Sequence, residues 1–425
     1  MNVLFVSPNA ERLFMPTLPL GLALVAAATR RAGHETRFLD LLAAADPLNE
    51  VRQAIAAFQP EVVAVSVRNV DDQTMLATKF LLGPVRDVIA VCRATSPAKI
   101  VVGGAGYSIF PEAALKYLGA DYGVCGEGEV VVPALLERLQ RGLDAAGLPG
   151  VYVRGGPTPT ARIFAEELDL LPLPEADLWA SADPQDPELW VPVQTRRGCP
   201  LACSYCSTPE LEGTDVRMRS PARVVEHIAK VAQAGFRKFY FTDNTFNFPA
   251  PYALELCRRL ADLRLADLRL ADLRLDLAWR CILYPHLVPE ELVAAMAAAG
   301  CVEVSLGFES GCPQVLQAMN KRFGPAEVRE ISGRLAAHGI RRMGFLLLGG
   351  PGETRESVGE SLAFARSLNL EILKVSVGIR LYPHTPLARL AVEEGVVSPE
   401  DNLLMPRFYI RPGLEDYIRQ VQREI

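Results

Sequence analysis

The feature that most constrains the fold is a repeated alternation of short apolar runs with helical patterns. Between residues 2 and 141 the apolar runs predict strands at 2–7, 35–39, 61–67, 99–102 and 121–125. The segments between them have helical periodicity, at 20–31, 48–58, 83–94, 111–118 and 130–141. Repeated βα units of this kind predict a doubly wound, Rossmann-like parallel sheet, which binds ligands beyond the carboxyl ends of its strands.

A second βα series begins at residue 191. Its predicted strands are 191–195, 237–242, 277–282, 302–307, 344–348 and 373–380, and its predicted helices are 221–234, 251–260, 289–299, 326–338 and 355–368. Six strands predict a partial (βα)6 barrel rather than the full eight-stranded form. We therefore expect an α/β chain with a first domain at 1–148, a proline-rich linker at 149–190, a barrel at 191–390 and a tail at 391–425.

The pentapeptide Arg-Leu-Ala-Asp-Leu occurs three times in tandem between residues 259 and 273. A period of five residues matches neither a helix nor a strand. We interpret it as a duplication that lengthens the end of a helix or the loop after it.

Composition narrows the function classes. The chain has 44 Lys and Arg against 50 Asp and Glu, a net charge of −6, and an acidic chain of this kind is a poor candidate for binding nucleic acid. No uncharged apolar run is long enough to span a membrane, and the first residues lack the features of a signal peptide. The nine cysteines are an odd number spread over a long chain. We therefore expect a cytoplasmic protein.

Three cysteines form the most specific motif. Cys199, Cys203 and Cys206 have the spacing CxxxCxxC just after a predicted strand. A zinc site would normally need a fourth ligand, and no further Cys or His lies nearby in the sequence. A [4Fe–4S] cluster also takes four ligands, so three thiolates would leave one iron open for a substrate or cofactor. The alternative, three cysteines that are merely buried, does not account for the spacing.

This segment resembles the radical S-adenosylmethionine (SAM) enzymes, whose motif is CxxxCxφC with an aromatic φ, here Tyr205. In that family the open iron binds SAM, and electron transfer cleaves SAM to a 5′-deoxyadenosyl radical. The resemblance therefore implies a cluster on the three cysteines, SAM, and an electron donor such as flavodoxin or ferredoxin.

The resemblance continues along the barrel and implies further SAM-binding residues. Gly307-Phe308-Glu309-Ser310 is similar to the family's ribose-contacting element, and the segment from Gly344 to Glu353 to its glycine-bearing fifth strand. The Gly-Gly-Glu often found after the second strand is replaced by Asp243-Asn244, so Asp243 either binds SAM or caps a turn. The implied SAM contacts are Tyr205, Asp243, Glu309, Ser310, Leu348 and Tyr382.

The first domain resembles the cobalamin-binding domain that precedes many radical SAM barrels. The resemblance rests on the strand-end segments Ser66-Val67-Arg68-Asn69, Val102-Gly103-Gly104 and Gly126-Glu127-Gly128-Glu129. Glycines there let a bulky corrin approach the backbone, although Gly103-Gly104 could equally serve a phosphate-containing cofactor. The implied cobalamin contacts are Ser7, Ser66, Arg68, Asn69, Gly103, Gly104, Tyr107, Gly126, Glu127 and Gly128.

The Asp-x-His-x-x-Gly motif that supplies a histidine to cobalt is absent from the sequence. We therefore expect no histidine from this domain on the lower face of cobalamin and place Arg68 and Asn69 beside that face. A cation there would disfavour a water ligand and help a methyl group leave. The alternative is that Arg68 forms an ion pair with Asp71 or Asp72.

The leading hypothesis is a cobalamin-dependent radical SAM methyltransferase that acts on an unactivated carbon of a small or medium natural product or lipid precursor. The alternative is a radical rearrangement, cyclisation or oxidation in which cobalamin is absent or is not the methyl donor. Candidate catalytic residues are Cys281, at a strand end expected to face the mouth of the barrel, and the nearby Tyr284.

Overall fold

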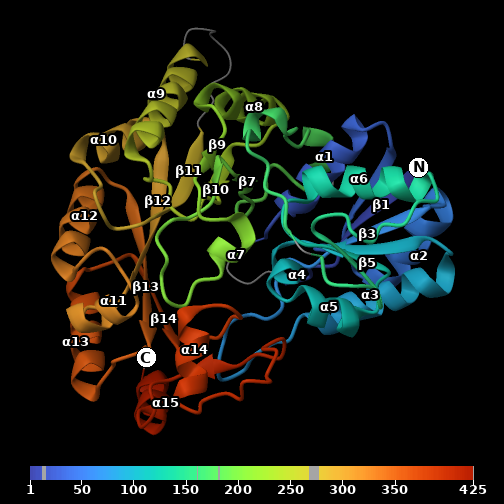
Figure 1. Ribbon diagram of the computed structural model, residues 1–425. Coiled ribbons are helices and arrows are strands. Elements are labelled where there is room, and N and C mark those ends of the chain that lie inside the picture. Colours follow the sequence, from blue (N-terminus) through green and yellow to red (C-terminus); the bar gives the residue numbers. More distant parts are fainter. Residues whose placement is uncertain (12–15, 160, 180–181, 268–276, 425) are drawn as a thin grey trace.

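The computed structural model describes residues 1–11, 16–159, 161–179, 182–267 and 277–424. Two six-stranded sheets lie side by side, each covered by helices, and the C-terminal segment packs at the lower edge of the barrel (Figure 1). In the described parts of the chain, no helix combines the length and the apolar character needed to cross a membrane.

The first sheet has the strand order β2-β1-β3-β4-β5-β6. Its strands are β1 (Asn2–Ser7), β2 (Glu35–Asp40), β3 (Val62–Ser66), β4 (Lys99–Gly103), β5 (Tyr122–Val124) and β6 (Val151–Val153). The first five are parallel, and the order reverses direction between β1 and β3, which is where sheets of this kind bind ligands.

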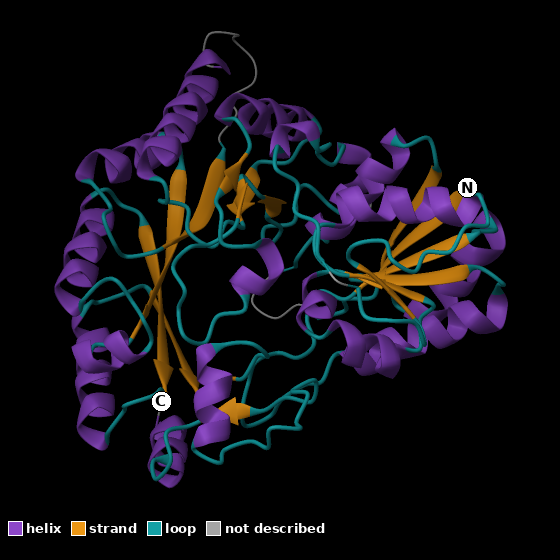
Figure 2. Ribbon diagram, viewed as in Figure 1, coloured by secondary structure: helices purple, strands orange, loops and turns teal. Residues whose placement is uncertain are grey.

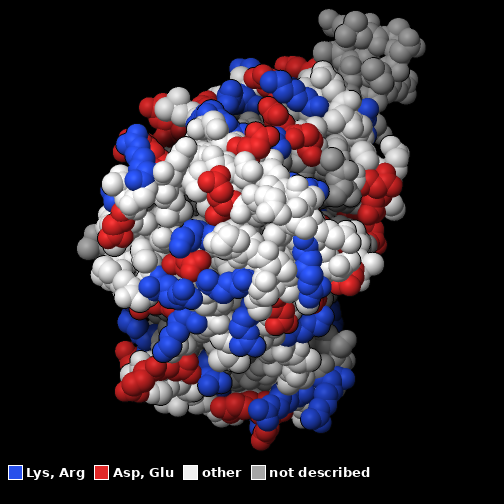
Figure 3. Space-filling model, turned by 90° about the vertical axis from the view of Figure 1, so that its right-hand side faces the viewer, with Lys and Arg blue, Asp and Glu red and all other residues white. Residues whose placement is uncertain are grey.

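Helices cover both faces of this sheet (Figure 2). α1 (Leu20–Arg31) and α6 (Gly128–Gln140) pack together on one face, and α2 (Pro47–Phe58), α3 (Leu82–Thr95) and α5 (Pro111–Leu118) lie on the other. Local signals set their ends, as at α2, where the Asp46 side chain accepts a hydrogen bond from the Asn49 backbone N–H. The outer surface on this side carries acidic and basic side chains interspersed (Figure 3).

The first sheet is larger than predicted. β6 pairs antiparallel with β5, so the segment expected to be a linker from residue 149 begins as a sixth strand. A strand of three residues is too short to show a period in the sequence. The short helix α4 (Ala105–Ile109), directly after β4, was also not predicted.

The second sheet is an open, parallel barrel of six strands in the order β14-β13-β12-β11-β10-β7, which confirms the predicted partial barrel. The strands are β7 (Val191–Val193), β10 (Lys238–Phe241), β11 (Ala278–Leu283), β12 (Cys301–Glu309), β13 (Arg341–Leu348) and β14 (Ile372–Val377). The covering helices are α8 (Pro221–Gln233), α9 (Ala250–Asp267), α10 (Glu290–Ala298), α12 (Pro325–Ala337) and α13 (Arg355–Ser367). α9 contains the first repeated pentapeptide, while residues 268–276 lie outside the described residues.

The segment after the barrel is ordered structure that packs on the barrel. β15 (Ile379–Arg380) pairs antiparallel with β16 (Phe408–Tyr409), and the chain ends with α14 (Pro386–Glu393) and α15 (Glu415–Glu424). Ile418 of α15 is fully buried in the main hydrophobic core. The expected tail is therefore part of the packed fold.

Candidate active site between the two sheets

The cysteine loop follows β8 (Arg196–Arg197), a two-residue strand that pairs with β9 (Arg217–Met218). Gly198 begins the loop with φ of 91°, and a Cβ atom there would lie 2.0 Å from the Asp215 carbonyl oxygen. Only glycine fits this position. Gly198 therefore fixes the direction in which the loop leaves β8.

The three thiols stand on this loop with different exposure. Cys199 is buried, whereas Cys203 and Cys206 are half-buried. Burial raises the pKa of the Cys199 and Cys203 thiols, so they ionise when a metal binds them rather than on their own. The Thr208 backbone N–H lies 3.5 Å from the Cys206 sulfur, a contact typical of a ligating thiolate.

The donor set fits an iron–sulfur cluster. All three cysteines are free, lie on one short loop, and include Cys206 at the wall of a large cavity. Within the described residues, no three Cys, His, Asp or Glu side chains stand together in ligating geometry. Three thiolates and no fourth protein ligand suit a cluster with one open iron.

Lys321 is a residue at this site that the sequence analysis missed. Its Nζ lies 2.9 Å from the Tyr205 hydroxyl and 3.4 Å from Oε1 of Glu309. Burial opposes its charge, but the Glu309 carboxylate raises the pKa of Lys321 well above its usual value. The buried ammonium group therefore joins the cysteine loop to the end of β12. A lone lysine after a short helix carries no signal in the sequence.

The predicted SAM contacts divide into two groups. Tyr205 and Tyr382 line the large cavity. Glu309 is half-buried with φ of 61°. It is linked to Tyr205 by Lys321, which contacts both side chains. The Ser310 and Leu348 side chains instead face the core and are fully buried. The Ser310 hydroxyl lies 2.8 Å from that of Ser361, so neither Ser310 nor Leu348 presents its side chain to the cavity.

Asp243 braces the backbone before the cysteine loop. Its carboxylate accepts hydrogen bonds from the backbone N–H groups of Thr195 and Arg196, at 2.8 and 3.1 Å, and from the Thr195 hydroxyl at 2.7 Å. Burial raises its pKa, while the adjacent Arg196 opposes that shift. Both carboxylate oxygens of Asp243 are therefore occupied by hydrogen bonds from Thr195 and Arg196. This arrangement fits the interpretation in which Asp243 caps a turn.

The expectation for Cys281 is corrected by the pleat of β11. Cys281 is 1% exposed and lies in the hydrophobic core among helices, whereas its neighbours Arg280 and Ile282 are on the opposite side of the strand. Tyr284 is also buried, and its hydroxyl accepts a hydrogen bond from the Arg322 backbone N–H at 2.9 Å. Tyr284 supports the segment that carries Lys321 and does not face the large cavity.

A smaller cavity of about 230 Å³ lies at the carboxyl ends of the first sheet's strands. The predicted cobalamin contacts that line it are Ser66, Gly103, Gly104, Gly126, Glu127 and Gly128. Gly104 has φ of 103°, and a Cβ atom there would lie 2.7 Å from the Val67 carbonyl oxygen. The cradle therefore depends on glycine, as expected for a bulky ligand that approaches the backbone.

Two predicted cobalamin contacts are buried inside the first domain. The Tyr107 side chain is fully buried against Gly123 on β5, and Ser7 is 2% exposed at the end of β1. Neither residue lines the cavity. Ser7 ends a strand and Tyr107 lies shortly after one. A position at the end of a strand does not determine the direction of the side chain.

Glu127 and Glu129 connect the smaller cavity to the cysteine loop. Glu127 lies 2.7 Å from Arg217, and Glu129 forms a buried ion pair with Arg197. Arg197 stands two residues before Cys199. The acidic residues of the Gly-Glu-Gly-Glu segment thus hold the base of the loop against the first domain.

A larger cavity of about 720 Å³ lies between the two sheets. Its lining includes Arg68 and Asn69 from the first domain, Tyr205 and Cys206 from the cysteine loop, and Lys374 from β14. Asp71 is paired with Arg380, and Asp72 accepts backbone N–H groups, so the proposed ion pair of Arg68 with either is not formed. Residues from both domains therefore face one chamber.

A glycine-lined cavity at the first sheet's switch point and a three-cysteine loop on a partial barrel together define a cofactor-dependent α/β enzyme. Residues 193–365 match the model of the radical SAM superfamily, and residues 10–136 match the B12 binding domain. The chain belongs to the radical SAM enzymes that carry a cobalamin-binding domain, and it is homologous to B12-dependent radical SAM methyltransferases.

Relatives span most of the chain. The tryptophan 2-C-methyltransferase of Streptomyces laurentii is 26% identical and matches 92% of this chain and 75% of its own length. The hopanoid C-3 methylase of Methylococcus capsulatus is 29% identical over 61% of this chain and 49% of its own.

A solved structure of the methyltransferase TsrM from Kitasatospora setae, with tryptophan and a SAM analogue bound, is 25% identical. It superposes with a TM-score of 0.86, covering 99% of this chain and 88% of that one. TsrM has also been solved with cobalamin and a [4Fe–4S] cluster bound, at a TM-score of 0.84, with 25% identity and coverage of 97% and 84%.

Proposed function

We propose that this enzyme is a cobalamin-dependent methyltransferase that methylates an unactivated carbon of a small or medium natural product or lipid precursor by way of a 5′-deoxyadenosyl radical. The observation that carries the proposal is the larger cavity, in which the cysteine loop and the Arg68-Asn69 segment face the same space. Methyl transfer needs a methyl carrier and a radical source within reach of one substrate, and residues proposed to contact each of them border this chamber.

When bound, cobalamin supplies methyl transfer and the reduced cluster supplies the electron that cleaves SAM. Cys199, Cys203 and Cys206 would hold the cluster. The buried Lys321 ammonium would attract the carboxylate of SAM, and Glu309 would accept hydrogen bonds from its ribose hydroxyls. Each of these groups lies on or beside the carboxyl end of a barrel strand.

Arg68 would lie beside the lower face of the corrin. Its side chain is exposed to the larger cavity, and Asp71 and Asp72 are engaged elsewhere. A fixed positive charge there disfavours a water ligand on cobalt. Gly103, Gly104, Gly126 and Gly128 would admit the corrin and its tail to the smaller cavity.

The walls of the larger cavity support a substrate with a sizeable apolar part. Phe345 and Leu347 on β13, Val375 on β14 and Met75 from the first domain line it, with Lys374 as a cationic group. The relatives named above include enzymes that act on tryptophan and hopanoids, which are molecules of this kind. An electron donor such as flavodoxin or ferredoxin would reduce the cluster, and we place the enzyme in the cytoplasm.

The test uses anaerobically reconstituted full-length protein with cobalamin, a reductant and SAM carrying a deuterated methyl group. We expect 5′-deoxyadenosine in the products and label recovered in the corrin fraction, while the Cys199→Ala/Cys203→Ala/Cys206→Ala variant gives no 5′-deoxyadenosine. Label that stays entirely on SAM in protein that holds both cofactors would contradict methyl transfer.

A second candidate is a radical cyclisation or oxidation without methyl transfer. The anaerobic magnesium-protoporphyrin IX monomethyl ester cyclase of Rubrivivax gelatinosus is 23% identical over 87% of this chain and 66% of its own length. Formation of 5′-deoxyadenosine without any transfer of label would favour this alternative.

A further inference from the structure

The loop at residues 67–81, between β3 and α3, crosses from the first domain to the barrel; we call it the bridging loop. It begins with Arg68 and Asn69 and then places Gln73, Thr74 and Met75 on the wall of the larger cavity. The first domain therefore supplies one wall of a chamber whose opposite wall is formed by β13 and β14.

The bridging loop is braced internally. Asp71 forms an isolated bridge with Phe80, and the Leu81 N–H donates to the Val70 carbonyl at 2.8 Å. The Asp72 carboxylate accepts hydrogen bonds from the backbone N–H groups of Thr74 and Lys79, both at 3.1 Å. These contacts make the loop a compact, internally braced unit.

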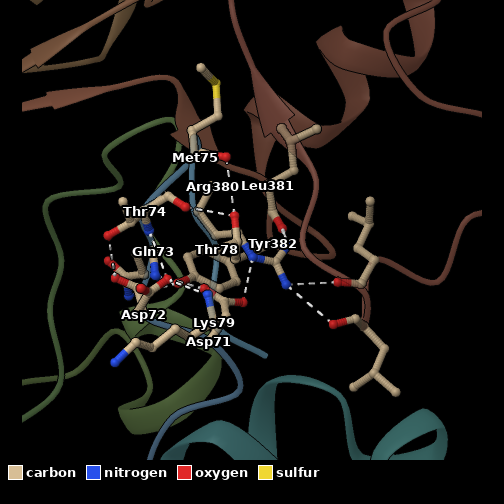
Figure 4. A network of polar contacts seen from close by, with 12 residues as sticks. Asp71, Asp72, Gln73, Thr74, Met75, Thr78, Lys79, Arg380, Leu381 and Tyr382 are labelled. Carbon is tan, nitrogen blue, oxygen red and sulfur yellow. Dashed lines mark hydrogen bonds and ion pairs between the residues drawn. The ribbon is translucent and has the colours of Figure 1, made fainter. Parts of the chain in front are cut away.

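Three contacts attach this unit to the barrel, and Figure 4 shows the residues of the two polar ones. Oδ2 of Asp71 lies 2.8 Å from Nε of Arg380, and both side chains are at most 3% exposed. The Gln73 amide donates to the Tyr382 hydroxyl at 2.9 Å. Met75 packs directly on Gly378, because a Cβ atom added to Gly378 would lie 2.5 Å from the Met75 sulfur.

Arg380 is held by the barrel independently of the loop. Its guanidinium donates to the carbonyl oxygens of Leu381 at 2.5 Å and Leu403 at 2.9 Å, and it lies 5.3 Å from the centre of the Tyr382 ring. The same guanidinium lies 5.5 Å from the ring of Phe110, which directly follows α4 in the first domain. These contacts therefore hold Arg380 in place, and its ion pair with Asp71 attaches the bridging loop to the barrel.

We propose that Asp71 and Arg380 are a positioning pair that fixes the bridging loop, and with it Arg68 and Asn69, at a set distance from the barrel. The inference rests on the proposed function, because its purpose is to hold the corrin-facing residues in line with the cysteine loop. Neither residue is a cofactor ligand in this account; both act through the position of Arg68 and Asn69.

The first test measures hydrogen–deuterium exchange of the bridging loop in full-length, cluster-loaded protein without cobalamin. Asp71→Asn keeps the shape of the side chain and its contact with the Gln73 N–H but removes the charge. We expect exchange of residues 68–81 to rise about tenfold or more. Arg380→Lys keeps the positive charge, so exchange of residues 68–81 should rise less than in Asp71→Asn. It is a second variant of the same pair that can be measured if Asp71→Asn does not fold.

Glu371→Gln is the matched control, because Glu371 and Arg342 form an ion pair of the same 2.8 Å length within the barrel. This variant should leave exchange of the bridging loop unchanged. A value for Asp71→Asn within twofold of the wild type, or an equal rise in Glu371→Gln, would overturn the proposal.

The second test records the electron paramagnetic resonance spectrum of bound cob(II)alamin. Asp71→Asn should still retain cobalamin through the smaller cavity, but with a changed axial signal because water gains access beside Arg68. An unchanged spectrum would overturn the link to cobalt. If the wild type retains no cobalamin, the proposed function fails. The exchange comparison alone then tests whether Asp71 and Arg380 position the bridging loop.

Discussion

The guanidinium of Arg197, two residues before the first cysteine of the cluster loop, is bonded to the carboxylate of Glu129 in the other domain. Both side chains are about 95% buried, and Glu127 lies 3.4 Å from the same guanidinium. Two carboxylates and one cation hold the base of the loop against the cobalamin-binding domain. The position of the cluster is thus tied to the position of the corrin cavity through one arginine.

We predict that Glu129→Gln lowers the free energy of unfolding by about 3 kcal/mol, because it removes a charge from a buried ion pair. Thermal unfolding of the apo protein measures this loss. Glu226→Gln breaks an exposed ion pair with Lys230 and should leave the free energy of unfolding almost unchanged. Equal stability losses in the two variants would contradict the structural role of Glu129.

Gly198→Ala should abolish cluster assembly. The added Cβ would lie 2.0 Å from a backbone oxygen, at a positive φ that alanine disfavours, so the loop cannot keep its path. Iron and sulfide content after reconstitution should fall to that of the triple cysteine variant. Gly333→Ala, on an open face of α12, should keep full cluster content and gain about 0.5–1 kcal/mol in stability.

Lys321→Met should weaken SAM binding about tenfold or more, because it removes the buried cation that holds Glu309 and Tyr205 together. Calorimetric titration of cluster-loaded protein with SAM measures the change. Lys230→Met, which removes an exposed lysine, is the control and should bind SAM as the wild type does. Wild-type affinity in Lys321→Met would exclude this residue from the SAM site.

Glu353 should make the protein less stable as the pH rises. Burial raises the pKa of its carboxyl to about 7 in the folded state, although two backbone N–H groups oppose the shift. The folded state therefore binds more protons than the unfolded state between about pH 4.5 and 7, so stability falls across that range.

The Glu353 contribution is at most about 3 kcal/mol. Glu353→Gln should remove this part of the pH dependence and unfold at a higher temperature than the wild type at pH 8. Stability curves of the two proteins that run parallel from pH 5 to pH 8 would refute the prediction.

The sequence predicted every strand of the two sheets except β6, because most of these strands are apolar runs bounded by glycine, proline or a polar residue. It could not predict which side chains face the chamber. The sequence of β11 does not show which face of the strand looks into the barrel, so Cys281 and its neighbour Arg280 could not be assigned to their sides. Ser310 and Tyr107 lie just beyond strand ends, where the alternation of a strand no longer sets the direction of a side chain.

Long-range partners were equally out of reach. Asp71 and Arg380 are 309 residues apart in the chain, and nothing in either local sequence points to the other. Arg68 illustrates the consequence, because the nearby Asp71 and Asp72 made an ion pair plausible until the structure placed Arg380 on Asp71. The cysteine motif was predictable because its three residues are close in sequence and its chemistry is specific.

Cobalamin retention tests the central claim most directly. Anaerobically reconstituted wild type and the Cys199→Ala/Cys203→Ala/Cys206→Ala variant would be mixed with hydroxocobalamin, desalted and compared by visible spectrum. We predict near-stoichiometric cobalamin on both proteins, because none of the three cysteines lines the glycine-lined cavity. Cluster absorption on the wild type without retained cobalamin would contradict the account and remove the basis for methyl transfer.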